Sequence, residues 1–67
     1  MSDTTVHRHD GFGGVRYVVR QAGEHIGIVY PPRKGVTYWA WSAGDITGTG
    51  RDQRECIDLV KLAARDA

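Results

Sequence analysis

The sequence predicts an α+β domain in which a three-stranded antiparallel β-meander packs on one C-terminal α-helix. Three observations predict this fold. Short runs of alternating residues between positions 15 and 43 are typical of strands, and turn residues separate them. A segment free of glycine and proline follows, with apolar residues at helical spacing. A chain of 67 residues has room for one small domain, which we expect over residues 15–67.

Residues 1–14 show no hydrophobic period, so we expect a flexible N-terminal tail, with Phe12 as a local anchor on the core. The run from His7 to Asp10, with His9 between them, resembles a short metal-binding cluster. Zinc needs three or four ligands, however, and no second pair of ligands follows at a suitable spacing. We therefore expect no metal and no other cofactor.

The expected strands are residues 15–21, 25–30 and 36–43. A tight turn at Gln21–Glu24 joins the first two, because Gly23 suits a positive φ angle. A longer loop over residues 31–35 joins the second and third. Its two prolines cannot donate hydrogen bonds to a neighbouring strand, so the second strand ends before them.

Alternate residues of a strand point to opposite faces, and the two predicted faces differ. One face is apolar or aromatic throughout: Val15, Tyr17, Val19, Ile26, Ile28, Tyr30, Val36, Tyr38 and Ala40. The other mixes cations with large aromatics: Arg16, Val18, Arg20, His25, Gly27, Val29, Thr37, Trp39 and Trp41. Arginines cannot be buried under a helix without paired partners. We therefore expect the helix on the first face, and Trp39 and Trp41 facing outward beside the arginines.

Residues 44–50 are rich in glycine and are expected to form a flexible connector. The helix should follow over about residues 52–65. Two overlapping pairs have the spacing of a capping box: Thr49 with Asp52, and Asp52 with Glu55. The apolar stripe of this helix consists of Cys56, Leu59, Val60 and Ala63.

The apolar arc of the helix is wider than one small sheet face requires, because Ile57 and Leu62 flank the stripe. These residues either wrap the edges of the sheet or meet a second subunit. A two-fold symmetric homodimer would cover them, through the helix flank or through an edge strand, and we favour the helix flank.

Charge is unevenly distributed. Between residues 15 and 43, four basic residues against one acid give a net charge of +3. Five basic residues against seven acids give −2 in the remainder. No apolar run approaches the length of a membrane span, and the N-terminus has no hydrophobic signal region, so we expect a cytoplasmic protein without a membrane partner.

Catalysis is not expected from this sequence. No Ser/His/Asp or paired-carboxylate arrangement is present, and so small a domain offers little volume for a substrate pocket. Cys56 is the only cysteine, which excludes an internal disulfide. It lies on the apolar stripe without a basic partner and is expected to fill the core. We therefore expect no catalytic residue and no small-molecule substrate.

The order of elements resembles the DNA-binding domains of plant ethylene-response factors and the arm-binding domains of phage integrases. The resemblance covers about residues 16–64 and is carried by Arg16, Arg20, Gly27, Pro32, Lys34, Gly35, Trp39, Cys56, Ile57, Ala63 and Ala64. In those families a three-stranded sheet backed by one helix enters the major groove with Arg and Trp on its outer face. The long basic stretch of the plant family's first strand is missing here. The chain is also similar to short proteins of actinobacteria and their phages, many of which bind one host protein.

These observations predict a binding module that uses its outer sheet face on duplex DNA, in a regulatory or recombination accessory role. The alternative is an adaptor or inhibitor, encoded by a phage or a bacterium, that docks the same face on a host protein. The residues expected to contact DNA or a protein partner are Arg16, Arg20, Arg33, Lys34, Thr37, Trp39 and Trp41. The two tryptophans could also shield a thin sheet, which is compatible with either function.

Overall fold

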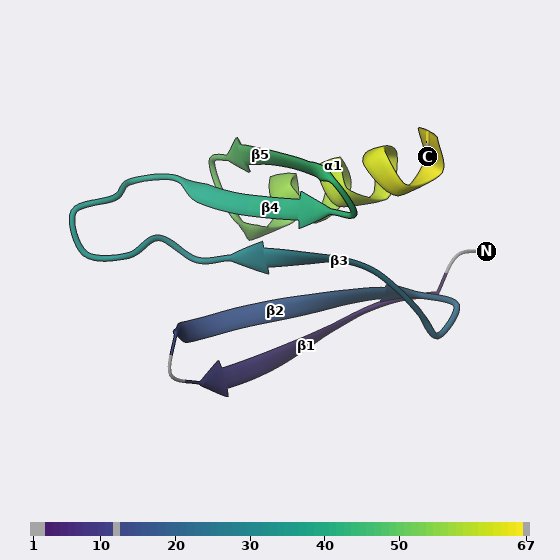
Figure 1. Ribbon diagram of the computed structural model, residues 1–67, viewed down its shortest axis with the longest axis horizontal. Helices are drawn as coiled ribbons and strands as arrows, with labels where there is room; N and C mark the ends of the chain where they lie inside the picture. Colours follow the sequence, from purple (N-terminus) through teal and green to yellow (C-terminus); the bar gives the residue numbers. More distant parts are fainter. Residues whose placement is uncertain (1–2, 12, 67) are drawn as a thin grey trace.

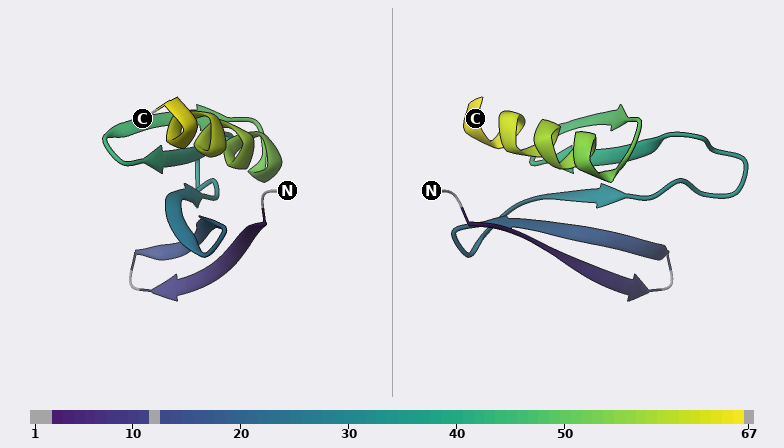
Figure 2. Two further views of the ribbon diagram at one scale, coloured as in Figure 1. Left: turned by 90° about the vertical axis from the view of Figure 1, so that its right-hand side faces the viewer. Right: turned by 180° about the vertical axis from the view of Figure 1, so that it is seen from behind.

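The computed structural model describes residues 3–11 and 13–66. Its elements are, in chain order, β1 (Thr4–Gly11), β2 (Gly14–Gln21), β3 (Glu24–Tyr30), β4 (Trp39–Ala43), β5 (Ile46–Gly50) and α1 (Gln53–Asp66). The strands form one antiparallel sheet in the order of the sequence, and α1 lies across one face of β3, β4 and β5 (Figures 1 and 2). The α+β class and the C-terminal helix are confirmed. The sheet has five strands, where three were expected.

Strand β1 occupies the region in which a flexible tail was expected. It pairs with β2 along its whole length, from Thr4 opposite Gln21 to Gly11 opposite Gly14. Nearly all of its residues are exposed, so the strand has no hydrophobic period by which the sequence would reveal it. The expected tail is therefore wrong for residues 4–11. Phe12, with its expected anchoring role, lies outside the described residues.

Strand β5 occupies the stretch that was expected to be a flexible connector. Ala43 and Ile46 pair across a two-residue turn, in which Gly44 has a φ angle of 62°. A positive φ at the first central residue is typical of the type II′ turns that join antiparallel strands. The glycines of β5 permit close packing instead of flexibility. A Cβ atom at Gly48 would lie 2.6 Å from the Trp41 ring.

The helix covers the face of β3 and β4 that was expected to be exposed. The buried core cluster consists of Val19, Val29, Trp41, Ala43, Cys56 and Val60. Tyr17 and Val19 face the helix as predicted, and Val29 pairs with Tyr17 on one side and with Trp41 on the other. The residues predicted to be exposed that lie on the helix face are Gly27, Val29, Trp39 and Trp41. Those predicted to be core that lie on the opposite face are Ile28, Tyr30 and Ala40.

A β-bulge explains the change of face. Val19 pairs with Gly27, but the next residue of β2, Arg20, pairs with His25, so β3 contains one extra residue, Ile26. Ile26 packs against the core, and its neighbour Gly27 lies on the same face. Beyond the bulge, strict alternation assigns the later residues of β3, including Ile28 and Tyr30, to the wrong face.

The start of α1 is fixed by the predicted capping box. The backbone N–H of Glu55 donates to Asp52 Oδ1 at 2.8 Å, and the N–H of Arg51 donates to Glu55 Oε1 at 3.3 Å. This confirms Asp52 as the cap residue, with Glu55 reaching back to the N–H of Arg51, one residue before the cap. Thr49 belongs to β5. Cys56 and Val60 of the predicted stripe are fully buried. Among the described residues, no helix combines the length and the apolarity that a membrane span requires.

Candidate functional site

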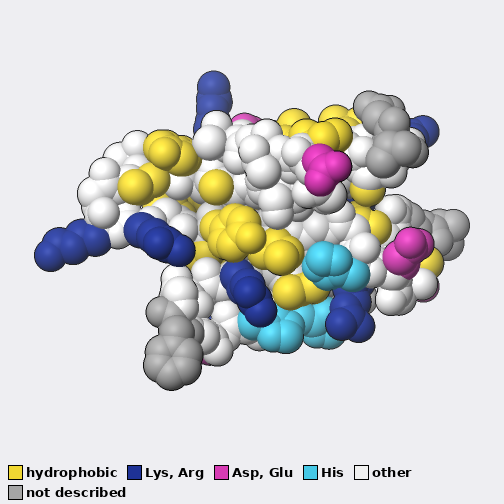
Figure 3. Space-filling view, in the orientation of Figure 1, with side chains coloured by type: hydrophobic (Ala, Val, Ile, Leu, Met, Phe, Trp, Pro, Cys, Tyr) yellow, Lys and Arg dark blue, Asp and Glu magenta, His cyan; other side chains and the backbone are white. Residues whose placement is uncertain are grey.

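The face of the sheet turned away from α1 is called the open face. By strand register it comprises Thr5, His7, His9, Arg16, Val18, Arg20, His25, Ile28, Tyr30, Ala40, Ser42, Thr47 and Thr49. None of these residues is acidic. Figure 3 shows this face with basic and histidine side chains gathered around a hydrophobic centre.

The arginines of the open face come from β2, and two histidines beside them come from β1. Arg16 and Arg20 are exposed, and so are His7 and His9, which alternate along β1 on the same side of the sheet. Asp10 lies on the other side of β1, where its Oδ1 is 3.3 Å from Arg8 Nε. Arg8 and Asp10 therefore pair with each other on that side, and the charged strand residues of the open face are Arg16 and Arg20.

The centre of the open face is apolar. Val18 is buried although no helix covers it, because it lies between its cross-strand neighbours His7 and Ile28. Ile28 and Tyr30 are half-buried in the next strand. The face thus combines a small apolar centre with a cationic margin on the β1–β2 side.

A cavity of about 290 Å³ lies where the β1–β2 hairpin meets the loop that follows β3. The polar side chains that line it are those of Arg16, Arg33, His9, Tyr30 and Asp10. Arg33 Nη2 donates to the backbone carbonyl of Gly13 at 3.1 Å, which ties the loop to the hairpin. Two guanidinium groups, an imidazole and a phenol can donate to an anion such as a phosphate. The Asp10 carboxylate at the rim opposes an anion, and its pairing with Arg8 offsets part of that charge.

The seven residues that were predicted to contact a partner lie in three different regions of the structure. Arg16 and Arg20 lie on the open face, as predicted. Arg33, Lys34 and Thr37 are exposed in the loop over residues 31–38, beyond the strands.

The predicted exposure of the two tryptophans is wrong. Trp41 is 8% exposed and belongs to the core, and its indole lies over Gly48. Trp39 is half-buried, and its ring centroid is 6.1 Å from that of Tyr17. Both indoles lie on the helix face, so neither is beside Arg16 and Arg20. Their burial on this face fits the alternative in which the indoles shield the sheet.

Sequence reasoning missed the contribution of His7, His9 and Tyr30 to the open face. The two histidines were assigned to a tail, although they alternate with Arg8 and Asp10 at the period of a strand. Tyr30 was assigned to the core because of the undetected bulge in β3.

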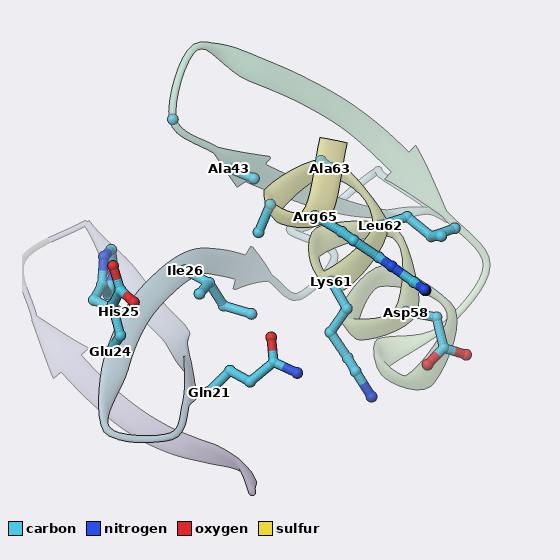
Figure 4. Close-up of a pocket in the computed structure, with 12 residues that line it drawn as sticks. Gln21, Glu24, His25, Ile26, Ala43, Asp58, Lys61, Leu62, Ala63 and Arg65 are labelled. Atoms are coloured by element: carbon cyan, nitrogen blue, oxygen red, sulfur yellow. The ribbon is translucent and has the colours of Figure 1, made fainter. Parts of the chain in front are cut away.

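A larger groove of about 890 Å³ lies between the β2–β3 turn and the C-terminal half of α1. In Figure 4 Gln21 and Glu24 lie on one side of it, and Lys61 and Asp58 come from the helix. Charges of both signs line this groove, so it offers no convergent set of donors or acceptors.

Cys56 is not placed for nucleophilic chemistry. Burial raises the pKa of its thiol above the ordinary 9.0, and the carboxylates of Glu55 and Asp52 raise it further. The thiol is therefore neutral at physiological pH. Within residues 3–11 and 13–66, no three His, Cys, Asp or Glu side chains are grouped so that they could hold a metal ion.

Comparisons of this chain with protein-family models, with curated proteins and with solved structures give no match.

Proposed function

We propose that this protein is a non-enzymatic module that binds duplex DNA through its open face. One observation carries the proposal: Arg16 and Arg20 are exposed beside His7 and His9 on a face without acidic strand residues. A polyanion is attracted to such a surface through its phosphates, whatever its base sequence.

The β1–β2 hairpin has the shape of a groove-binding ribbon. It extends beyond the part of the sheet on which α1 packs, so its two strands are the ones most free to approach a ligand (Figures 1 and 2). The major groove, roughly 12 Å wide, admits a two-stranded β-ribbon. Arg16 and Arg20 are four residues apart on one strand, which separates them by about 13 Å. Their guanidinium groups can therefore reach both sides of the groove or the base edges between them.

The cavity at the loop end supplies a position for one phosphate. Arg16 and Arg33 would hold its oxygens, with His9 beside them, and Lys34 and Thr37 would contact the neighbouring backbone from the loop. On the far side of the open face, hydroxyl groups of β4 and β5 can donate to phosphates or base edges. The tryptophans have no direct contact in this arrangement.

A fluorescence-anisotropy titration with a labelled duplex of mixed sequence tests the proposal. We expect binding in the micromolar range at about 50 mM salt. Three or four phosphate contacts predict a slope of about −3 for log K against log salt. No binding at micromolar protein in that buffer would contradict the proposal.

An adaptor or inhibitor that docks the open face on a host protein is the second candidate. The apolar centre around Val18, Ile28 and Tyr30, inside a cationic margin, also suits an acidic protein surface. Co-purification from host lysate, with and without nuclease, separates the two functions. A partner that survives nuclease treatment and is lost with Tyr30→Ala would favour the second candidate over DNA.

A further inference from the structure

The two edges of the sheet differ in their chemistry. The edge strand β1 carries charged or ionisable side chains at four consecutive positions, His7 to Asp10, which discourage pairing with another strand. The opposite edge strand, β5, consists of Ile-Thr-Gly-Thr-Gly and has neither a charge nor a proline. In the part of the chain that the structure describes, β5 pairs only with β4 and forms the rim of the sheet (Figure 1).

The outer side of β5 presents free backbone groups at known positions. Ala43 and Ile46 close a two-residue hairpin and form its first hydrogen-bonded pair. Because hydrogen-bonded and non-hydrogen-bonded pairs alternate, Ile46, Gly48 and Gly50 use their groups toward β4. The N–H and C=O groups of Thr47 and Thr49 therefore point outward from the sheet.

We infer that β5 pairs antiparallel with β5 of a second copy of this chain, across a two-fold axis at Gly48. In this register Thr47 of each copy lies opposite Thr49 of the other, and both exchange N–H to C=O hydrogen bonds. The Thr side chains also pair across the strands, which stabilises antiparallel ribbons. The outward N–H and C=O groups of Thr47 and Thr49 then all have hydrogen-bond partners in the other copy.

The charges that flank β5 support this register. Asp45 precedes the strand and Arg51 follows it, so antiparallel pairing about Gly48 brings Asp45 of each copy opposite Arg51 of the other. Within one copy the two residues are separated by the whole strand, about 20 Å. Their opposite charges are therefore complementary only between copies. The exposed Ile46 side chain, 47% accessible in one copy, comes to lie opposite Gly50 of the partner.

The resulting dimer is closed. An axis perpendicular to the sheet puts both helices on one side and both open faces on the other, and the charged β1 strands become the two outer edges. The inference concerns the outer backbone edge of β5 and not the basic side chains of the open face, and it does not rest on DNA binding.

Sedimentation equilibrium of the wild-type chain tests the inference. We expect a mass of twice 7.4 kDa at high micromolar concentration. Thr49→Pro removes an outward N–H without breaking a bond to β4, and it should give a monomer with an unchanged circular dichroism spectrum. Leu62→Glu, on the exposed helix flank, is the matched control and should remain dimeric.

Charge reversal gives a second test that does not depend on proline. Asp45→Arg or Arg51→Asp alone should raise the dissociation constant about tenfold, because two ion pairs per dimer become repulsive. The double variant, Asp45→Arg with Arg51→Asp, should restore the wild-type value. A wild-type monomer at high micromolar concentration would overturn the inference. A dimer that survives Thr49→Pro and both reversals, or one that Leu62→Glu dissociates, would also overturn it.

Discussion

Val60 of α1 rests directly on the backbone of Gly27 in β3. A Cβ atom built on Gly27 would lie 2.5 Å from Val60 Cγ1 and 2.5 Å from the carbonyl oxygen of Ser42. Real Cβ atoms do not approach other atoms so closely, so this contact sets the distance between the helix and the sheet. The helix, in turn, decides which sheet face remains open.

Gly27→Ala should therefore lower the free energy of unfolding by about 1–3 kcal/mol, because the new methyl group forces the helix away from the sheet. Urea denaturation followed by circular dichroism measures the change. Gly11→Ala is the matched control, since nothing lies within 4 Å of its added Cβ, and it should change stability little. Equal stability of the two variants would mean that the helix does not pack on Gly27.

Trp41→Ala should lower the free energy of unfolding by about 3–5 kcal/mol, because it empties the core over Gly48. Thermal unfolding measures this loss. The milder Trp41→Phe should retain the fold and leave DNA affinity unchanged, since the indole lies on the helix face. Loss of DNA affinity in a normally folded Trp41→Phe protein would show that the indole contacts the ligand.

The β2–β3 turn offers a stabilising substitution. Ala22 and Gly23 have φ angles of 54° and 81°, the signs required at the two central residues of a type I′ turn. Alanine is strained in this region, whereas asparagine tolerates it. Ala22→Asn should raise the free energy of unfolding by about 1 kcal/mol, whereas the β-branched Ala22→Val should lower it. Chemical denaturation of both variants measures these changes. A valine variant more stable than the wild type would contradict a type I′ turn at Ala22 and Gly23.

Cys56 should be unreactive toward a thiol reagent in the native protein and should react readily once the chain is unfolded in denaturant. The raised pKa has a consequence for stability. The unfolded state releases the thiol proton near the ordinary 9.0 and the native state only at higher pH, so stability is full below that value and falls as the pH rises through the native pKa. Cys56→Ser should flatten this alkaline loss. Fast native-state alkylation at neutral pH would contradict the burial of the thiol.

The helix was predictable from the sequence because its signals are local. The capping box at Asp52 and Glu55 and the spacing of Cys56 and Val60 lie within a few turns of one element. Nothing distant in the chain can alter them, and the structure has them as predicted.

The open face was predictable only in β2. Arg16 and Arg20 cannot be buried without partners, so the face of β2 that carries them was correctly predicted to point away from the helix. In β3 the alternation failed after Ile26, because this extra residue shifts the register and apolar residues occur on both faces of the strand. Strand β1 escaped notice because its pairing depends on backbone hydrogen bonds and not on an apolar face. Strand β5 was not predicted because its glycines are typical of a flexible connector. In the structure these glycines make room for the side chains of Trp41 and Cys56.

The most direct test of the central claim compares two pairs of arginines in DNA binding. Arg16→Ala with Arg20→Ala removes two charges from the open face, and Arg54→Ala with Arg65→Ala removes two from the exposed side of α1, so both proteins have the same net charge. Anisotropy titrations over a salt series should show the first pair weakened about tenfold or more, with the salt slope reduced by about 2. The second pair should bind like the wild type. Equal weakening of both pairs, or a larger loss in the helix pair, would contradict DNA binding by the open face.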